Sequence, residues 1–264
     1  MGVPELLSSQ SGIVLNIAHR GGTSTYGPDL IRAIRQSLED GADGIELDVQ
    51  STSDGALVIF HDWTVRTAAG RRKVGSLSLI DLRTAVGDSS GSRVPLLAEV
   101  LDAVEHEAAV VILDVKATGI VDRIAAQVAA AGVEVRTAVA SFHHEPLARL
   151  QSAGSGLSTI VTIGWSRAAT NPLGLAWSIR VSSTPVAAAK AVGAHAVLCP
   201  AARVTTGLVQ QAHREGIAVL VWNVVPSTDI EALVALGVDG LLDRDPRHLR
   251  DALARSVRRE RGRS

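Results

Sequence analysis

The amino-acid sequence predicts a single α/β domain folded as a (β/α)8 barrel. The chain has 264 residues, a length that suits one barrel domain. Apolar residues make up 46% of the sequence, which is enough for a large core and excludes global disorder. Short β-rich apolar runs also alternate with segments of helical spacing along the chain. This alternation is typical of βα units around a parallel sheet.

Eight apolar runs are candidates for the strands of the barrel. Each is almost continuously apolar, as expected for a parallel strand that is buried on both faces. The runs are residues 13–18, 44–49, 109–115, 137–141, 157–163, 194–198, 218–224 and 240–242. Because eight parallel strands close a TIM barrel, their number supports this architecture.

Eight segments of helical spacing lie between or after these runs. Several have Pro, Ser or Thr near the start and Gly just after the end, as helices commonly do. The segments are residues 28–40, 95–106, 119–131, 145–153, 185–192, 205–215, 227–235 and 246–256. We therefore expect a helix after each strand.

We expect one domain over residues 1–254, with two excursions from the barrel. The first, about residues 50–94, contains a turn at Asp54-Gly55 and a small strand at 57–60. The second, about residues 164–184, is rich in Gly, Pro and Trp. Residues 255–264 carry arginines at 255, 258, 259, 261 and 263 against Glu260. This basic end is expected to be a disordered tail, with weak attraction to an anionic membrane surface as the alternative.

Charge and composition exclude several classes of function. The net charge is −1, and four Trp, two Phe and one Tyr are too scattered to stack nucleic acid bases. The single Cys199 excludes an internal disulfide, and no Cys/His spacing indicates a zinc site. Residues 1–13 lack the charge and apolar run of a signal peptide, and no apolar stretch approaches about 18 residues. We expect a soluble, cytoplasmic protein.

Acidic residues at the ends of two predicted strands indicate a metal site. Glu46 and Asp48 are two residues apart on one strand, so their side chains share a face, which inside a barrel is the interior. Buried carboxylates repel one another unless a cation neutralises them or they retain their protons, and a metal ion is the simpler explanation. Asp114 on a neighbouring strand would supply a third oxygen, which suits Mg²⁺ or Ca²⁺. A structural ion pair is the alternative for each residue.

Two histidines and two cationic residues follow strands on the same rim. His19 and His61 can divide acid and base roles, one neutral and one protonated. Arg20 and Lys116 add positive charge beside the carboxylates, which favours an anionic ligand such as phosphate. Salt bridges to the acidic residues are the alternative for both cations.

Sequence motifs in a characteristic order point to one enzyme family. The N-terminal part contains HRG at 19–21, PD at 28–29, GADGIELDVQ at 41–50, SDG at 53–55 and HD at 61–62. Shorter motifs follow, namely LDVK at 113–116, SF at 141–142, VWN at 221–223 and GVDG at 237–240. In order and spacing these motifs resemble the glycerophosphodiester phosphodiesterase family. The resemblance covers nearly the whole chain, and its N-terminal block is the most specific part.

The resemblance implies a TIM barrel that hydrolyses glycerophosphodiesters to glycerol 3-phosphate and an alcohol with a divalent cation. It implies the following roles: His19 and His61 as the catalytic pair, Glu46, Asp48 and Asp114 as metal ligands, Arg20 and Lys116 as phosphate contacts, and Trp222 as the aromatic near the pocket mouth. The third ligand is usually Glu in the family. The substrate is a small-molecule phosphoester or is derived from a lipid, and the oligomeric state stays open.

Two segments depart from the family pattern. Asp29-Leu30-Ile31 replaces the usual Glu-Asn-Thr, which leaves the loop more apolar and less suited to a small polar glycerol head. Asp243-Arg244 replaces Thr-Asp near the last strand. An aspartate as third ligand also resembles the sphingomyelinase D group. That group lacks the arginine at position 20, so the phosphodiesterase family is the closer match.

Two other functions remain open from the sequence. The same metal site would suit a lyase, cyclase or hydrolase acting on a lipid or prenyl-type phosphate or diphosphate, with Trp165 and Trp177 lining its pocket. Barrel packing is the alternative role of these tryptophans. The chain would otherwise be a non-catalytic barrel that binds a phosphate ligand. Analysis of the products distinguishes lyase or cyclase chemistry from hydrolysis, and turnover distinguishes an enzyme from a binding protein.

Overall fold

The computed structural model describes residues 12–22, 29–90, 93–164 and 184–261. Eight parallel strands form a closed barrel in chain order, because each pairs with the next and the last pairs with the first. They are β1 (Leu15–His19), β2 (Gly44–Ser51), β6 (Val110–Val115), β7 (Thr137–Ser141), β8 (Ser158–Thr162), β9 (Ala196–Pro200), β10 (Ala218–Trp222) and β11 (Gly240–Asp243). The predicted (β/α)8 barrel is confirmed, with one strand in each predicted run.

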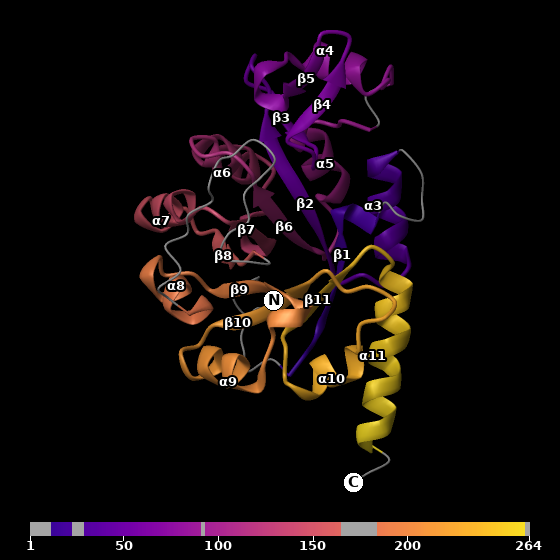
Figure 1. Ribbon diagram of the computed structural model, residues 1–264, viewed down its shortest axis with the longest axis vertical. Coiled ribbons are helices and arrows are strands. Elements are labelled where there is room, and N and C mark those ends of the chain that lie inside the picture. The colour runs from indigo at the N-terminus through magenta and orange to yellow at the C-terminus, as the bar shows by residue number, and fades with distance from the viewer. Residues whose placement is uncertain (1–11, 23–28, 91–92, 165–183, 262–264) are drawn as a thin grey trace.

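Helices surround the strands, as Figure 1 shows. They are α3 (Leu30–Glu39), α5 (Leu97–Val104), α6 (Val121–Ala130), α7 (His144–Ser152), α8 (Pro185–Ala191), α9 (Thr206–Arg214), α10 (Ile230–Ala235) and α11 (Pro246–Arg261). Side chains at their N-termini stabilise several of them. Asp29 accepts from the Arg32 backbone N–H at 3.0 Å, and Thr184 and Thr205 cap α8 and α9 in the same way.

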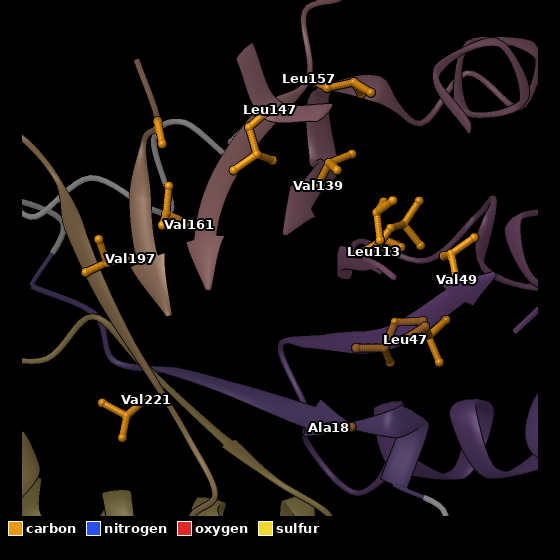
Figure 2. Packing of buried hydrophobic residues seen from close by; sticks show 14 of the residues in the cluster. Ala18, Leu47, Val49, Leu113, Val139, Leu147, Leu157, Val161, Val197 and Val221 are labelled. Carbon is orange, nitrogen blue, oxygen red and sulfur yellow. The ribbon is translucent and has the colours of Figure 1, made fainter. Parts of the chain in front are cut away.

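Alternate residues of each strand pack into two apolar layers. The layer between strands and helices includes Leu47, Val49, Leu113 and Val139, whose packing is shown in Figure 2. The other layer fills the barrel itself and includes Ile17 and Ile112. Since Leu47 and Val49 point to the helices, Glu46 and Asp48 point into the barrel. The strand alternation therefore fixes the direction of both acidic side chains.

The first excursion contains more structure than the sequence predicts. The predicted short strand is β3 (Leu57–Ile59), which pairs antiparallel with β2. A hairpin of β4 (Thr64–Thr67) and β5 (Gly70–Lys73) follows, and then α4 (Leu79–Ala85). These elements lie together at the top of Figure 1. They share a small core that includes Val65, Val74 and Leu82.

Most of the second excursion, with Trp165 and Trp177, lies outside the described residues. At the C-terminus, α11 extends to Arg261, so a helix occupies much of the segment expected to be a disordered tail. The physical reason is that arginine and alanine favour helix, and the sequence places no Gly or Pro between Pro246 and Gly262. In the described part of the chain, every helix is too short or too polar to cross a bilayer.

Candidate active site

Three acidic side chains lie together inside the barrel, toward the carboxyl ends of β2 and β6. Asp48 on β2 is in register with Asp114 on β6, and Glu46 precedes Asp48 by two residues. Each offers one carboxylate oxygen within 4.8 Å of the others, and all three residues are buried. The structure thus brings together the three residues predicted to bind metal.

Burial and mutual repulsion set the charges of this cluster. Burial, together with the carboxylates of Asp48 and Asp114, raises the pKa of Glu46 well above its usual value. Burial also raises the pKa of Asp114, against the effect of the Lys116 ammonium. At Asp48 burial acts in the same direction, but Lys116 and His61 outweigh it and lower the pKa. Two of the carboxyl groups therefore resist ionisation in the absence of a further cation.

Two cationic side chains contact the acidic cluster. The buried Lys116 ammonium lies 2.7 Å from Asp48 Oδ1 and 2.5 Å from Asp114 Oδ2. Arg20 Nε lies 3.7 Å from Asp48 Oδ2, and the Arg20 backbone N–H donates to Glu46 Oε2 at 3.1 Å. Both cations thus form the salt bridges that were the alternative interpretation of these residues. Their contact with a substrate phosphate stays a prediction.

The two histidines flank the cluster in different environments. His19 Nε2 lies 3.6 Å from Glu46 Oε2, and burial together with the charge of Arg20 lowers the pKa of His19 to about 3. The His61 side chain is 42% exposed, with Nδ1 2.8 Å from Asp62 Oδ1 and Nε2 2.5 Å from Arg20 Nη2. A guanidinium can only donate, so His61 Nε2 is the acceptor in this contact. The division of the two histidines into one acid and one base stays a prediction.

A left-handed turn after β1 positions Arg20. Its φ is 53°, a conformation that side chains other than glycine rarely adopt, and Gly21 and Gly22 continue it at 66° and 74°. The turn directs the Arg20 backbone N–H at Glu46 and the guanidinium at His61. The HRG motif signals the glycines in the sequence. The strained conformation of Arg20 itself has no sequence signal.

Two aromatic residues lie on the same rim of the barrel. Trp222 ends β10, packs on the apolar interior, and donates its indole N–H to the Ile163 carbonyl at 3.2 Å. Its predicted contact with substrate stays a prediction. Phe142, which follows β7, lies under the Lys116 ammonium at 5.7 Å from the ring centroid. Phe142 was not among the predicted site residues, although its position after a strand was a signal.

A cavity of 630 Å³ opens beside the cluster. Arg20, Asp48 and His61 line it together with residues of β4 and β5. Leu30 faces this cavity, whereas Ile31 lines a separate hollow next to α3. The apolar loop expected over the site is therefore present at one of its two positions.

The last barrel loop also contributes to this cavity. Arg244 lines it, while Asp243 Oδ2 lies 2.7 Å from His248 Nδ1 and ties the loop to α11. Arg244 was noted in the sequence only as a departure from the motif, so its place in the cavity was missed.

Comparison with known proteins decides the family. The model of the glycerophosphoryl diester phosphodiesterase family matches residues 19–247, which is most of the chain. The chain belongs to this family. It is thereby an enzyme that hydrolyses phosphoric diesters, and the resemblance inferred from the motifs is confirmed.

Full-length relatives of this phosphodiesterase share its size and fold. A glycerophosphodiester phosphodiesterase of Caldanaerobacter subterraneus subsp. tengcongensis is 29% identical over 247 residues, covering 89% of this chain and 96% of the relative. A Parabacteroides distasonis glycerophosphodiester phosphodiesterase has a TM-score of 0.72 at 21% identity, covering 92% and 99% of the two chains. An Oleispira antarctica phosphodiesterase, solved with the product sn-glycerol-3-phosphate, has a TM-score of 0.70 at 19% identity, covering 94% and 99%. At these identities the two structures establish a shared fold.

The acidic cluster of this phosphodiesterase fits a divalent cation, in keeping with a metal-dependent family. Asp114 Oδ1 is buried and has no hydrogen-bond partner among the described residues. An unpaired carboxylate oxygen is costly in a buried site, so a further cation beside it is expected. The donor set of three carboxylates suits a hard ion with oxygen ligands.

The turn that holds Arg20 gives a stability prediction for this phosphodiesterase. A Cβ on Gly22 would lie 2.0 Å from Ser37 Oγ, which donates to the Gly21 carbonyl in the core. We expect Gly22→Ala to lower the free energy of unfolding by about 2 kcal/mol or more, from left-handed strain plus loss of this buried hydrogen bond. The control is Gly119→Ala, since Gly119 also has positive φ but no atom within 4 Å of its Cβ position. If urea unfolding shows the same loss of unfolding free energy for both variants, the clash with Ser37 is not the cause.

Proposed function

We propose that the chain hydrolyses glycerophosphodiesters to glycerol 3-phosphate and an alcohol, with Mg²⁺ or Ca²⁺ as cofactor. The geometry that supports this most directly is the convergence of Glu46, Asp48 and Asp114 within 4.8 Å inside the barrel. Two histidines and two cationic side chains lie beside these carboxylates and could supply proton transfer and charge stabilisation at a phosphoryl group. The glycerol 3-phosphate bound to the Oleispira antarctica relative supports the proposed product.

Glu46, Asp48 and Asp114 would hold the cation. When bound, the ion polarises a phosphoryl oxygen and offsets charge that develops in the transition state. The three carboxylates are already preorganised, because the register of β2 and β6 fixes their spacing before any ligand binds. Mg²⁺ and Ca²⁺ both prefer such oxygen ligands.

Arg20 and Lys116 would bind the phosphoryl group. Lys116 now donates to Asp114 Oδ2, and Arg20 Nε forms an ion pair with Asp48 Oδ2 at 3.7 Å. With those carboxylates holding a cation, Arg20 and Lys116 would be available to donate to a phosphate. Trp222, at the end of β10, would contact the substrate at the mouth of the pocket.

The histidines would move the two protons of hydrolysis. His19, which is neutral, would accept a proton from the attacking water as the new P–O bond forms. When phosphate engages Arg20, the Nε2 atom of His61 is released from the guanidinium and would take up a proton from the solvent, and His19 would return its proton to the solvent after the reaction. His61 would then protonate the alcohol oxygen as its bond to phosphorus breaks.

Release of glycerol 3-phosphate tests this proposal. We expect the purified protein to release it from glycerophosphocholine, glycerophosphoethanolamine or glycerophosphoglycerol, to lose activity in chelator, and to regain it with Mg²⁺ or Ca²⁺. In ¹⁸O-labelled water the product should gain one labelled oxygen in a single turnover. A cyclic phosphate without label would indicate intramolecular transfer instead. Binding without turnover would indicate a non-catalytic barrel.

A further inference from the structure

The cavity beside the acidic cluster is rich in guanidinium groups. Five arginines line it: Arg20 after β1, Arg66 on β4, Arg71 on β5, Arg93 before α5 and Arg244 after β11. The acidic residues that line it, Asp48 and Asp62, already contact Lys116 at 2.7 Å and His61 at 2.8 Å. The wall of this cavity therefore carries an excess of positive charge.

The β4–β5 hairpin places two of these charges opposite each other. Arg66 pairs directly with Arg71 in the antiparallel ladder, and both side chains line the cavity. Like charges at directly opposed positions destabilise a hairpin, because their side chains lie on one face within contact distance. An anion bound in the cavity between Arg66 and Arg71 would relieve this repulsion.

Three of the five arginines, Arg66, Arg71 and Arg93, form no salt bridge within the described ranges. Arg71 Nη2 donates to the Thr64 hydroxyl at 2.9 Å, and Arg93 Nη1 donates to the Val86 carbonyl at 3.0 Å. No carboxylate among the described residues forms a salt bridge with Arg66, Arg71 or Arg93. All three residues are exposed, and their neutral contacts leave further guanidinium N–H groups to donate.

The position of the cavity relative to the reacting centre identifies what enters it. Arg20 and His61, which flank the acidic cluster, line the same cavity as the opposed arginines of the hairpin. A diester bound at the acidic cluster would thus extend one of its two arms past His61 toward Arg66 and Arg71. The glycerol arm carries only hydroxyl groups and has no charge to match the arginines. The arm that enters the cavity is therefore the second alcohol of the diester, which can carry an anionic group.

We propose that this pocket selects glycerophosphodiesters whose alcohol carries a second anionic group, such as a phosphomonoester. The inference rests on the proposed hydrolysis and specifies its substrate class. A phosphomonoester between Arg66 and Arg71 accepts paired N–H donors from each guanidinium and removes their repulsion. Arg93 and Arg244 contribute positive charge to the same pocket.

A matched pair of diesters tests the selection. Glycerophosphoglycerol and the same diester with a phosphomonoester on its distal hydroxyl group differ only in the second anionic group. We expect the anionic diester to have a kcat/KM at least about 10-fold higher, mainly through a lower KM, because each charge-assisted hydrogen bond contributes severalfold or more. This preference should shrink as ionic strength rises, because salt screens exposed charges.

Arginine variants link the preference to this pocket. The double variant Arg66→Ala/Arg71→Ala should lower the ratio of kcat/KM for the anionic over the neutral diester about 10-fold. Its melting temperature should not fall, because the change removes a repulsive pair. Arg214→Ala, on the exposed surface of α9, removes an equal charge elsewhere and should preserve the ratio. Arg66→Glu should lower the ratio further than Arg66→Ala.

The outcomes separate this inference from the proposed function. Equal kcat/KM for the two diesters, or a ratio unchanged in the double variant, overturns the selection while hydrolysis stands. If the wild-type protein cleaves neither these diesters nor glycerophosphocholine with either metal ion, the proposed function fails, and the selection fails with it.

Discussion

Replacing Glu46 with glutamine should abolish metal-dependent turnover and, in chelator, make the protein more stable. Glu46 is buried beside two other carboxylates, and both burial and their charge raise its pKa. Without a metal ion its ionised form is therefore unfavourable in the folded state. Glutamine keeps the shape and removes the charge, so we expect a gain of about 1 kcal/mol in the metal-free protein at neutral pH. Loss of a ligand should lower kcat/KM at least about 100-fold.

The sign of the stability effect follows from proton linkage. When the folded pKa of a carboxyl group is raised, the folded state binds more protons than the unfolded state between the two pKa values. The stability of the metal-free wild-type protein therefore falls as pH rises from the ordinary value of 4.5 toward the raised one. The advantage of Glu46→Gln should grow over the same pH range.

Thermal unfolding with Mg²⁺, Ca²⁺ or chelator measures both effects. The wild-type protein should be stabilised by the ion and the variant should not, because an ion that binds only the folded state stabilises it. Glu39→Gln, at an exposed position of α3, is the matched control and should behave as wild type. A Glu46→Gln protein that keeps the stabilisation by metal and its turnover would refute the metal site.

Asp114→Asn distinguishes this argument from a general effect of losing charge. Asp114 Oδ2 accepts from the buried Lys116 ammonium, so its replacement weakens a buried ion pair. We expect metal-free Asp114→Asn to be less stable than wild type, which is the opposite sign from Glu46→Gln. Stabilisation of both variants in chelator would show that repulsion dominates and that the Lys116 pair contributes little.

The sequence was sufficient for the barrel and for the direction of its acidic side chains. Eight apolar runs predicted eight strands, and alternation along β2 placed Glu46 and Asp48 on one face because each strand is regular. The β4–β5 hairpin could not be predicted in this way. Between Thr64 and Lys73 one buried residue, Val65, packs into the small core. That core gathers side chains from separate short segments, which leave no periodic pattern.

The composition of the site was predictable, but its contacts were not. Strand ends brought His19, Asp48 and Asp114 to one rim, since parallel strands end on the same side of a barrel. The partners of Lys116 and the left-handed conformation of Arg20 depend on distances between strands and on a turn. Likewise, Arg66 and Arg71 face each other only because the hairpin sets their register. Such features arise from tertiary structure.

The proton roles of the histidines predict different responses to the leaving group. If His61 protonates the departing oxygen, His61→Ala should lower kcat on glycerophosphocholine by about 10²–10⁴-fold. On a p-nitrophenyl ester of glycerol 3-phosphate the loss should shrink to about 10-fold or less, because this leaving group departs without a proton. His19→Ala should lower kcat on both substrates, since the attacking water still needs a base.

A third histidine variant controls for general effects, and the two substrates then decide the assignment. His106→Ala, at an exposed position after α5, should leave both rates unchanged. Equal losses for His61→Ala on both substrates would show that His61 does not protonate the leaving oxygen. If His19→Ala instead regains most of its kcat on the p-nitrophenyl ester, His19 is the acid and His61 is the base. His61 is the better donor on geometric grounds, because it lines the cavity proposed to hold the alcohol, whereas His19 is half-buried beside Glu46.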